Sequence, residues 1–210
     1  MKNIESERHS IIILIGPMST GKGTIAQLLA DELGIPRYEM DELRHKFYGE
    51  MGYDEKLASK IVGDEGMMSL IRYWKPFEAY AVERALEEFD NCVLDFGAGH
   101  SVYEDEEFFS RVETALKPIE NVILILPSPD LDRSVEIVNE RFSALLVSEV
   151  GKVDPELLRL NEHFVRHPSN SILAKKTVYT EGQTAEETTA EIIKWIQNSE
   201  GADDGKEISA

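Results

Sequence analysis

The chain of 210 residues has a single cysteine, Cys92, and no long apolar segment. One cysteine excludes an intrachain disulfide and argues against a cysteine-based zinc site, and within the apolar run NCVLDF we expect it to fill space in the core. The run IIILI at residues 11–15 is far shorter than the ~20 residues of a membrane span. Because no basic leader precedes a long apolar stretch, we expect a soluble cytoplasmic protein with no membrane partner.

Basic residues are also scarce, with 22 Lys and Arg against 40 Asp and Glu and a formal net charge of -18. This balance argues against nucleic acid as the main ligand, since a phosphate backbone requires a basic face. In so acidic a protein, a basic pocket for a phosphorylated ligand is a local exception. The length fits one domain with a sizeable core. The sequence leaves the oligomeric state open.

The stretch GPMSTGKGT, residues 16–24, lies between IIILI and the helix-like segment IAQLLADEL. A strand, a glycine-bracketed loop ending in lysine and a helix can hold a triphosphate, because backbone N–H groups wrap the β-phosphate and the lysine reaches the phosphate oxygens. Gly23 stands where the pattern G-x-x-x-x-G-K-[ST] has a hydroxyl, so we expect Mg²⁺ to be held mostly by ATP, water and a carboxylate. The expected nucleotide-binding residues are Gly16, Met18, Ser19, Thr20, Gly21, Lys22, Gly23 and Thr24.

Strand-like and helix-like segments alternate along the chain. We expect strands at 11–15, 35–40, 91–96, 121–126 and 176–180, and helices at 21–33, 41–51, 54–89 with an interruption near Pro76, 104–117, 128–142 and 185–197. Residues 143–170 are helical in pattern but only weakly apolar. The alternation predicts an α/β fold of three layers, a five-stranded parallel sheet with helices on both faces.

Parallel sheets of this kind bind ligands outside the carboxyl ends of their strands. We therefore expect the loops that follow the first four strands to meet at one crevice. Residues 1–9 are expected to form a flexible arm, residues 10–198 the domain, and residues 199–210 a disordered tail with nothing to bury.

The variant GKGT at residues 21–24 looks like the loop of nucleoside monophosphate kinases such as adenylate kinase. Beyond this loop, most of residues 10–198 resemble the shikimate kinase and gluconate kinase branch of small-molecule kinases. The resemblance implies a P-loop NTPase fold with an acceptor-binding region at about 40–90 and a small lid at about 141–160. It also implies ATP and Mg²⁺ as cofactors and a small-molecule acceptor.

The second expected strand ends in YEMDEL, which resembles the aromatic-x-D-x-D motif of that branch. By this resemblance Asp41 receives the acceptor hydroxyl, although Asp41 could also be the N-cap of the next helix. Glu39 replaces the first aspartate of the motif. Glu39 and Asp95, which closes the third strand, are the expected metal-binding carboxylates, and a loop cap is the alternative role of Asp95.

The third strand is followed by GAGHS, where shikimate kinases carry three glycines. Gly97 and Gly99 are retained and Ala98 replaces the middle glycine, so an acceptor could still approach the backbone closely. His100 either touches the substrate or forms a hydrogen bond within its loop.

Arginines are the expected ligands of anionic groups, because a guanidinium offers a planar fork to carboxylate or phosphate. By resemblance, Arg72 binds the acceptor with Glu78 as its partner, and a solvated charge on the helix surface is the alternative role of each. Arg141 is expected to close the lid over the transferred phosphoryl group, with Arg133 as a weaker candidate. The expected catalytic residues are Lys22, Asp41 and Arg141.

Two further arginines complete the predicted acceptor site. Arg44 in DELR resembles the arginine of the adenylate kinase motif D-x-L-R, and Arg166 matches a late substrate-binding arginine of the shikimate kinase branch. The nearby His163 and His167 lack a third ligand at a suitable sequence spacing, so no metal site is expected there. The expected acceptor-binding residues are Asp41, Arg44, Arg72, Gly97, Ala98, Gly99, His100 and Arg166.

Three functions remain open from the sequence. The first is a kinase that transfers the ATP γ-phosphoryl group to a hydroxyl of a small polar metabolite, and the departures in the acceptor motifs argue against shikimate itself. The second is a nucleoside monophosphate kinase, favoured by GKGT and DELR but opposed by DFGAGHS, which lacks the proline and arginine of D-G-F-P-R. The third is a nucleotide-dependent regulator that has lost phosphotransfer.

Overall fold

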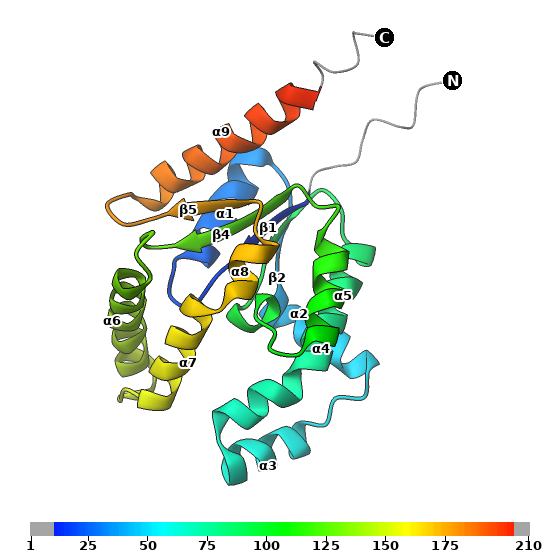
Figure 1. The fold of residues 1–210 in the computed structure, drawn as a ribbon, viewed down its shortest axis with the longest axis vertical. Helices are drawn as coiled ribbons and strands as arrows, with labels where there is room; N and C mark the ends of the chain where they lie inside the picture. The colour runs from blue at the N-terminus through cyan, green and yellow to red at the C-terminus, as the bar shows by residue number, and fades with distance from the viewer. Residues whose placement is uncertain (1–10, 204–210) are drawn as a thin grey trace.

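A central sheet between two helical layers forms the core of the computed structural model, which describes residues 11–203 (Figure 1). The sheet has five strands in the order β2-β3-β1-β4-β5. They are β1 (Ile12–Ile15), β2 (Arg37–Glu39), β3 (Val93–Asp95), β4 (Asn121–Leu126) and β5 (Lys176–Tyr179). Every neighbouring pair is parallel, so the predicted α/β fold is confirmed.

Helices cover both faces of this sheet. One face carries α1 (Lys22–Leu33) and α9 (Ala185–Asp203), and the other carries α2 (Met40–Glu50), α4 (Met67–Glu88), α5 (Glu106–Leu116) and α8 (Pro168–Leu173). The remaining elements are α3 (Glu55–Glu65), the 3₁₀ helix η1 (Ala98–Ser101), α6 (Leu131–Val150) and α7 (Pro155–Arg166). In Figure 1, α3 and the start of α4 extend below the sheet, and α6 packs beside α7.

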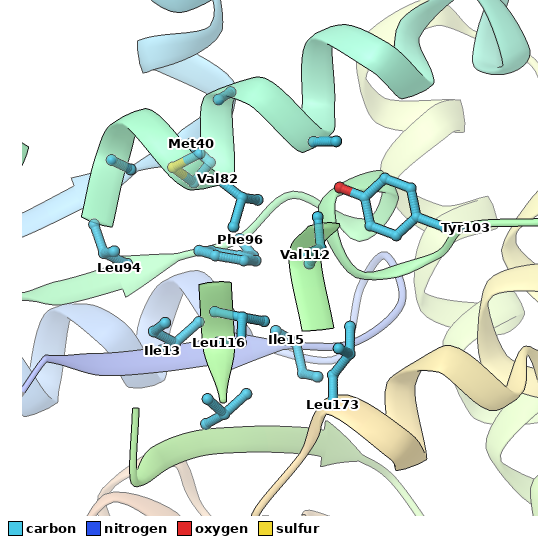
Figure 2. Close-up of a cluster of buried hydrophobic side chains, with 14 of the residues drawn as sticks. Ile13, Ile15, Met40, Val82, Leu94, Phe96, Tyr103, Val112, Leu116 and Leu173 are labelled. Atoms are coloured by element: carbon cyan, nitrogen blue, oxygen red, sulfur yellow. The ribbon is translucent and has the colours of Figure 1, made fainter. Parts of the chain in front are cut away.

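β1 is apolar at every position because both faces of the sheet are covered. Ile13 and Ile15 point into the cluster drawn in Figure 2, while Ile12 and Leu14 face α1 and α9. All four side chains are fully buried, and burying an aliphatic side chain of this size contributes roughly 1.5–3 kcal/mol. Cys92 belongs to the first cluster, and burial raises the pKa of its thiol to about 12.

The helical segment predicted at 54–89 is interrupted at Gly66 and not near Pro76. Gly66 separates α3 from α4 with a φ of +86°, and the adjoining N–H of Met67 donates to Glu156 Oε1 at 3.0 Å. Pro76 lies inside α4. A proline removes one backbone hydrogen bond, and packing of the following turns against the sheet outweighs that loss.

Asp41 does not cap α2, contrary to one of its two predicted roles. The helix begins at Met40 and its N-cap residue is Glu39, whose side chain makes no capping hydrogen bond. Asp41 therefore lies within the first turn, where the positive end of the helix dipole favours a carboxylate. Its oxygens are left available for contacts outside the helix.

The weakly apolar residues 143–170 form the end of α6, all of α7 and the start of α8. α6 continues to Val150 because Leu146 extends its buried face, and Gly151 ends it with a φ of +76°. Asp154 then caps α7 through its carboxylate. The predicted lid region at about 141–160 thus consists of the second half of α6, the turn at Gly151 and the first half of α7.

The last helix is longer than the sequence predicts. α9 reaches Asp203, so residues 199–203 are helical where a disordered tail is predicted. The rest of that tail and the predicted arm at 1–9 lie outside the described residues. Within residues 11–203, every helix is too short or too polar to cross a lipid bilayer.

Candidate active site

The loop between β1 and α1 has a backbone that requires glycine at two positions. Gly16 has a φ of +136°, and a Cβ there would lie 2.5 Å from the backbone oxygen of Ile125. Gly21 has a φ of +93° and directly precedes α1. The loop therefore curls around the start of α1, where backbone N–H groups and the helix dipole favour an anion.

Lys22 is the buried cation of this loop. Its Nζ donates to the backbone oxygens of Gly16 and Pro17, both at 2.8 Å. Burial lowers the pKa of Lys22, and the nearby charges of Asp95 and Asp41 act in the opposite direction. The three charged groups thus lie near one another at the carboxyl edge of the sheet.

Asn161, which the sequence analysis did not single out, holds the loop through hydrogen bonds to Met18. The fully buried Asn161 of α7 accepts from the N–H of Met18 at 2.9 Å, and its amide group donates to the Met18 oxygen at 3.4 Å. The hydroxyl of Thr20 donates to the oxygen of Pro17 within the loop. Asn161 carries no sequence signal because it lies in a helix far along the chain, and only the fold brings it to the loop.

A cavity of about 430 Å³ opens beside the loop. It is lined by loop residues 18–24 and by predicted metal and acceptor residues from the ends of β2 and β3, namely Glu39, Asp41, Asp95, Gly97 and Ala98. The fold thus gathers these predicted residues at one crevice, as expected for a parallel sheet.

Asp41 lies directly against the backbone of Gly97. A Cβ on Gly97 would overlap the Asp41 carboxylate, with its Cγ only 2.7 Å away. Gly97 therefore has to be glycine for Asp41 to keep this position. The side chain of Asp41 is exposed, so its carboxylate faces the cavity and not the core.

Arg37 joins the two predicted metal carboxylates. Its Nη2 lies 2.8 Å from Glu39 Oε1 and 2.7 Å from Asp95 Oδ2. Gly23 lies beside this group, since a Cβ on it would be 3.2 Å from Arg37 Nη2. The sequence analysis did not single out Arg37, because its role depends on the pairing of β2 with β3.

Glu78 is paired with Lys75 and not with the predicted partner Arg72. Lys75 Nζ donates to Glu78 Oε2 at 2.6 Å and to the backbone oxygen of Gly99 at 3.0 Å, and both side chains are 4% exposed. Arg72 is exposed. Lys75 and Glu78 stand at positions i and i+3 and are both buried, so they can pair within α4, whereas Arg72 is exposed to solvent.

A second cavity of about 460 Å³ lies between α2, α3 and α4. Its wall includes Arg44, whose guanidinium lies 5.4 Å from the ring centre of Trp74. Tyr48 lines the same cavity; burial raises the pKa of its hydroxyl, the charge of Glu78 adds to this rise, and Arg44 opposes it. The cavity is thus bounded by a cation beside aromatic surfaces.

Three arginines predicted from the resemblance do not reach either cavity. Arg141 is exposed on α6, whereas Phe142 and Leu145 of the same helix line the phosphate-loop cavity. Arg166 pairs with one carboxylate on α6 and one on α7, at 2.7 and 2.9 Å. Arg133 is likewise engaged by two surface carboxylates. An arginine from α6 could reach the phosphates only after a movement of that helix.

His100 is buried and lines neither cavity. Its side chain is enclosed at 2% exposure, its ring lies 6.1 Å from that of Phe96, and neither ring nitrogen has a hydrogen-bond partner among the described residues. The predicted contact with an acceptor would therefore require a change in η1. Gly99 is also set back from the cavities, where its lack of a Cβ makes room for the Glu78 carboxylate.

No family model matches the chain. It is 27% identical over 191 residues to a shikimate kinase of Streptomyces coelicolor, which covers 90% of this chain and 97% of the relative. Among solved structures, a shikimate kinase from Acinetobacter baumannii in complex with shikimate superposes with a TM-score of 0.61 at 21% identity, covering 90% of this chain and 94% of that one. A gluconokinase from Sinorhizobium meliloti gives 0.55 at 16% identity, covering 93% and 98%.

The parallel sheet with helices on both faces matches the fold of P-loop NTPases, and the shikimate kinases among the relatives indicate that the chain is a kinase, which is a phosphotransferase. The shikimate kinase relatives support, more narrowly, a small-molecule kinase of the shikimate kinase and gluconate kinase branch, as the sequence predicts. The similarity to the solved structures shows the fold alone. The relatives do not determine which acceptor this chain phosphorylates.

Proposed function

We propose that the protein transfers the γ-phosphoryl group of ATP to a hydroxyl of a small polar metabolite that carries a negative charge. The observation that carries the proposal is the place of Asp41: it lines the cavity of the phosphate loop, and it lies one helical turn before Arg44, which lines the second cavity. A carboxylate between the donor loop and a cationic pocket is suited to receive a proton from an attacking hydroxyl.

The chain's own residues supply the remaining steps. The loop N–H groups and Lys22 would hold the β- and γ-phosphates, and Asp41 would orient the acceptor hydroxyl for in-line attack and take its proton. Phe142 and Leu145 on the opposite wall would exclude water from the transfer. If Arg141 closes over the phosphoryl group, α6 has to turn it inward.

The cavity also offers a suitable place for Mg²⁺. Glu39 and Asp95 present hard oxygen ligands beside Thr24, and such ligands suit this ion. Arg37 forms an ion pair with one oxygen of each carboxylate. Glu39 and Asp95 would therefore bind a hydrated ion through its water molecules. Bound Mg²⁺ would supply positive charge to the phosphate oxygens.

Arg44 supports an anionic acceptor. The guanidinium lines the second cavity, is stacked on Trp74, and pairs with no carboxylate of residues 11–203. A planar guanidinium of this kind binds a carboxylate or phosphate in a forked geometry. We infer a hydroxy acid that differs from shikimate, since Lys75 provides the buried cation beside Glu78 where an arginine was predicted.

A nucleoside monophosphate kinase is the second candidate. The observation that favours it is the same Arg44, which follows Asp41 at the D-x-L-R spacing and faces a cavity large enough for a nucleotide base and sugar. The two candidates differ in the acceptor alone, so one assay separates them.

The experiment measures ADP formation from MgATP with a panel of hydroxy acids, sugars, nucleosides and nucleoside monophosphates. Stimulation by a hydroxy acid or a polar metabolite supports the first proposal, and stimulation confined to nucleoside monophosphates supports the second. Arg44→Gln should raise the acceptor KM in either case without changing the KM for ATP. Binding of ATP with no stimulation by any acceptor would instead favour a nucleotide-dependent regulator.

A further inference from the structure

Three potential metal ligands converge at a place that the proposed reaction does not use. They are Glu104 in the loop after η1, His163 in the last turn of α7, and His167 directly after that helix. One ligand atom of each lies within 4.8 Å of the others. Glu104 is 59 positions before His163 in the chain, so the sequence spacing of the two histidines alone gave no third ligand.

The local structure explains why the three meet. His163 and His167 are four residues apart across the end of α7, which places their rings on one side of the helix at 5.2 Å between centres. His163 Nε2 lies 2.7 Å from Glu104 Oε1. Glu104 is exposed and both histidines are half-buried, so the cluster is open to solvent on one side.

The ligand types select a class of ion. Imidazole nitrogens suit Zn²⁺ and its transition-metal neighbours, whereas Mg²⁺ prefers oxygen ligands. A tetrahedral ion with ligand bonds of ~2.1 Å needs its ligand atoms roughly 3.4 Å apart, so the atoms of this cluster would have to shift by about an ångström or less. Two histidines and one glutamate leave the fourth position for water.

We propose that Glu104, His163 and His167 form a binding site for one Zn²⁺-class transition-metal ion, separate from the Mg²⁺ that the phosphates would bring. The ion would fasten the end of α7 to the loop that follows η1. The same helix carries Asn161, which holds the backbone of Met18 in the phosphate loop. Metal binding would therefore stiffen the support of the loop without touching the reacting groups.

A simpler role for these residues is the Glu104–His163 hydrogen bond alone, which already joins the two segments. The two roles make different predictions for His167. A hydrogen-bonded pair does not need His167, whereas a metal site loses a ligand when His167 is replaced.

The test is a titration of the full-length chain, first stripped with a chelator, with ZnCl₂ in the presence of a chromophoric competitor and excess Mg²⁺. We expect one equivalent of Zn²⁺ to bind. Glu104→Gln, His163→Ala and His167→Ala should each weaken binding by ~100-fold or more, because even substitutions behind a ligand often cost 10–100-fold. Co²⁺ should give the intense visible absorption of a tetrahedral ion.

His45→Ala is the matched control, because His45 is an exposed histidine of α2 outside the cluster, and it should bind Zn²⁺ like the unaltered chain. Zn²⁺ should also raise the Tm of the unaltered chain but not of Glu104→Gln. Absence of a stoichiometric Zn²⁺ site, or a site retained in both Glu104→Gln and His167→Ala, would overturn the proposal. None of these readouts depends on phosphotransfer, so they remain decisive whatever acceptor the enzyme uses.

Discussion

The proposed donor end and the proposed acceptor end of the crevice are built in different ways. The donor end is one continuous segment, residues 16–24, whose glycines set its backbone conformation, and Asn161 of α7 adds a contact from outside the segment. The acceptor end lies between α2, α3 and α4, and Lys75 of α4 also donates to the backbone of Gly99 in η1. A local motif therefore specifies the donor, whereas the acceptor depends on contacts between distant segments.

The buried lysine at each end illustrates this difference. Among residues 11–203, the hydrogen bonds of Lys22 Nζ go only to backbone oxygens of its loop, so its charge is available to phosphates. The charge of Lys75 is already compensated by Glu78. Substitution of Lys22 should therefore act on turnover, and substitution of Lys75 should act first on folding stability.

The largest effect is expected for Lys22→Ala. Turnover should fall by ~10³-fold or more, the scale seen when a charge on a transferring phosphoryl group is lost. ADP formation measures it, while circular dichroism should show an unchanged fold. Lys117→Ala, which removes an exposed lysine at the end of α5, is the control. Near-normal turnover in Lys22→Ala would contradict the proposal that this lysine binds the phosphates of the donor.

Lys75→Met should destabilise the protein by about 3–5 kcal/mol, because it leaves the Glu78 carboxylate buried without a partner. The double variant Lys75→Met with Glu78→Leu should recover much of this loss, since well-packed apolar groups can replace a buried ion pair. Urea unfolding measures both free energies. If the double variant is no more stable than the single one, the pair does not organise the acceptor end as described.

A methyl group added at Gly97 or at Gly99 should change different kinetic constants. In Gly97→Ala the new Cβ would displace Asp41, so kcat should fall roughly 10- to 100-fold, whereas in Gly99→Ala it would displace Glu78 and raise the acceptor KM. Steady-state kinetics distinguish the two. Gly63→Ala in α3 meets open space and should leave the kinetics unchanged. Identical kinetic changes in Gly97→Ala and Gly99→Ala would argue against distinct roles.

The smallest effect concerns the pH dependence of stability in the metal-free protein. The hydrogen bond with His163 lowers the pKa of Glu104 from 4.5 to about 2, so its stabilisation is present above pH 4.5 and is lost as the pH falls toward 2. Because the group is exposed, we expect no more than about 1 kcal/mol. The difference in unfolding free energy between the unaltered chain and Glu104→Gln should shrink over that range, and a constant difference would contradict the assignment.

The sequence predicts the backbone of the donor end, namely β1, the glycine turn and the start of α1, because these segments are adjacent and obey local rules. It misplaces the helix break, since Glu156 of a distant helix accepts from the N–H of Met67 beside Gly66, while Pro76 is tolerated within α4. The sequence also predicts Arg72 as the partner of Glu78, where the structure has Lys75. Both basic residues lie in one helix, and only the packing of α4 decides which of them is buried.

Contacts across strands and between remote helices account for the residues that the sequence could not reveal. Arg37 bridges Glu39 and Asp95 only because β2 pairs with β3. Asn161 reaches the phosphate loop only because α7 packs beneath it. Neither residue forms part of a motif, so no spacing rule would have identified it.

The central claim is that Asp41 connects the donor loop to the acceptor, and the most direct test is kcat of Asp41→Asn at saturating ATP with a competent acceptor. Glu42→Gln, which removes the neighbouring exposed carboxylate of the same helical turn, is the matched control. We predict that Asp41→Asn lowers kcat by ~10²- to 10⁴-fold with little change in ATP affinity, while Glu42→Gln stays near the unaltered rate. Equal rates for the two variants would contradict the account.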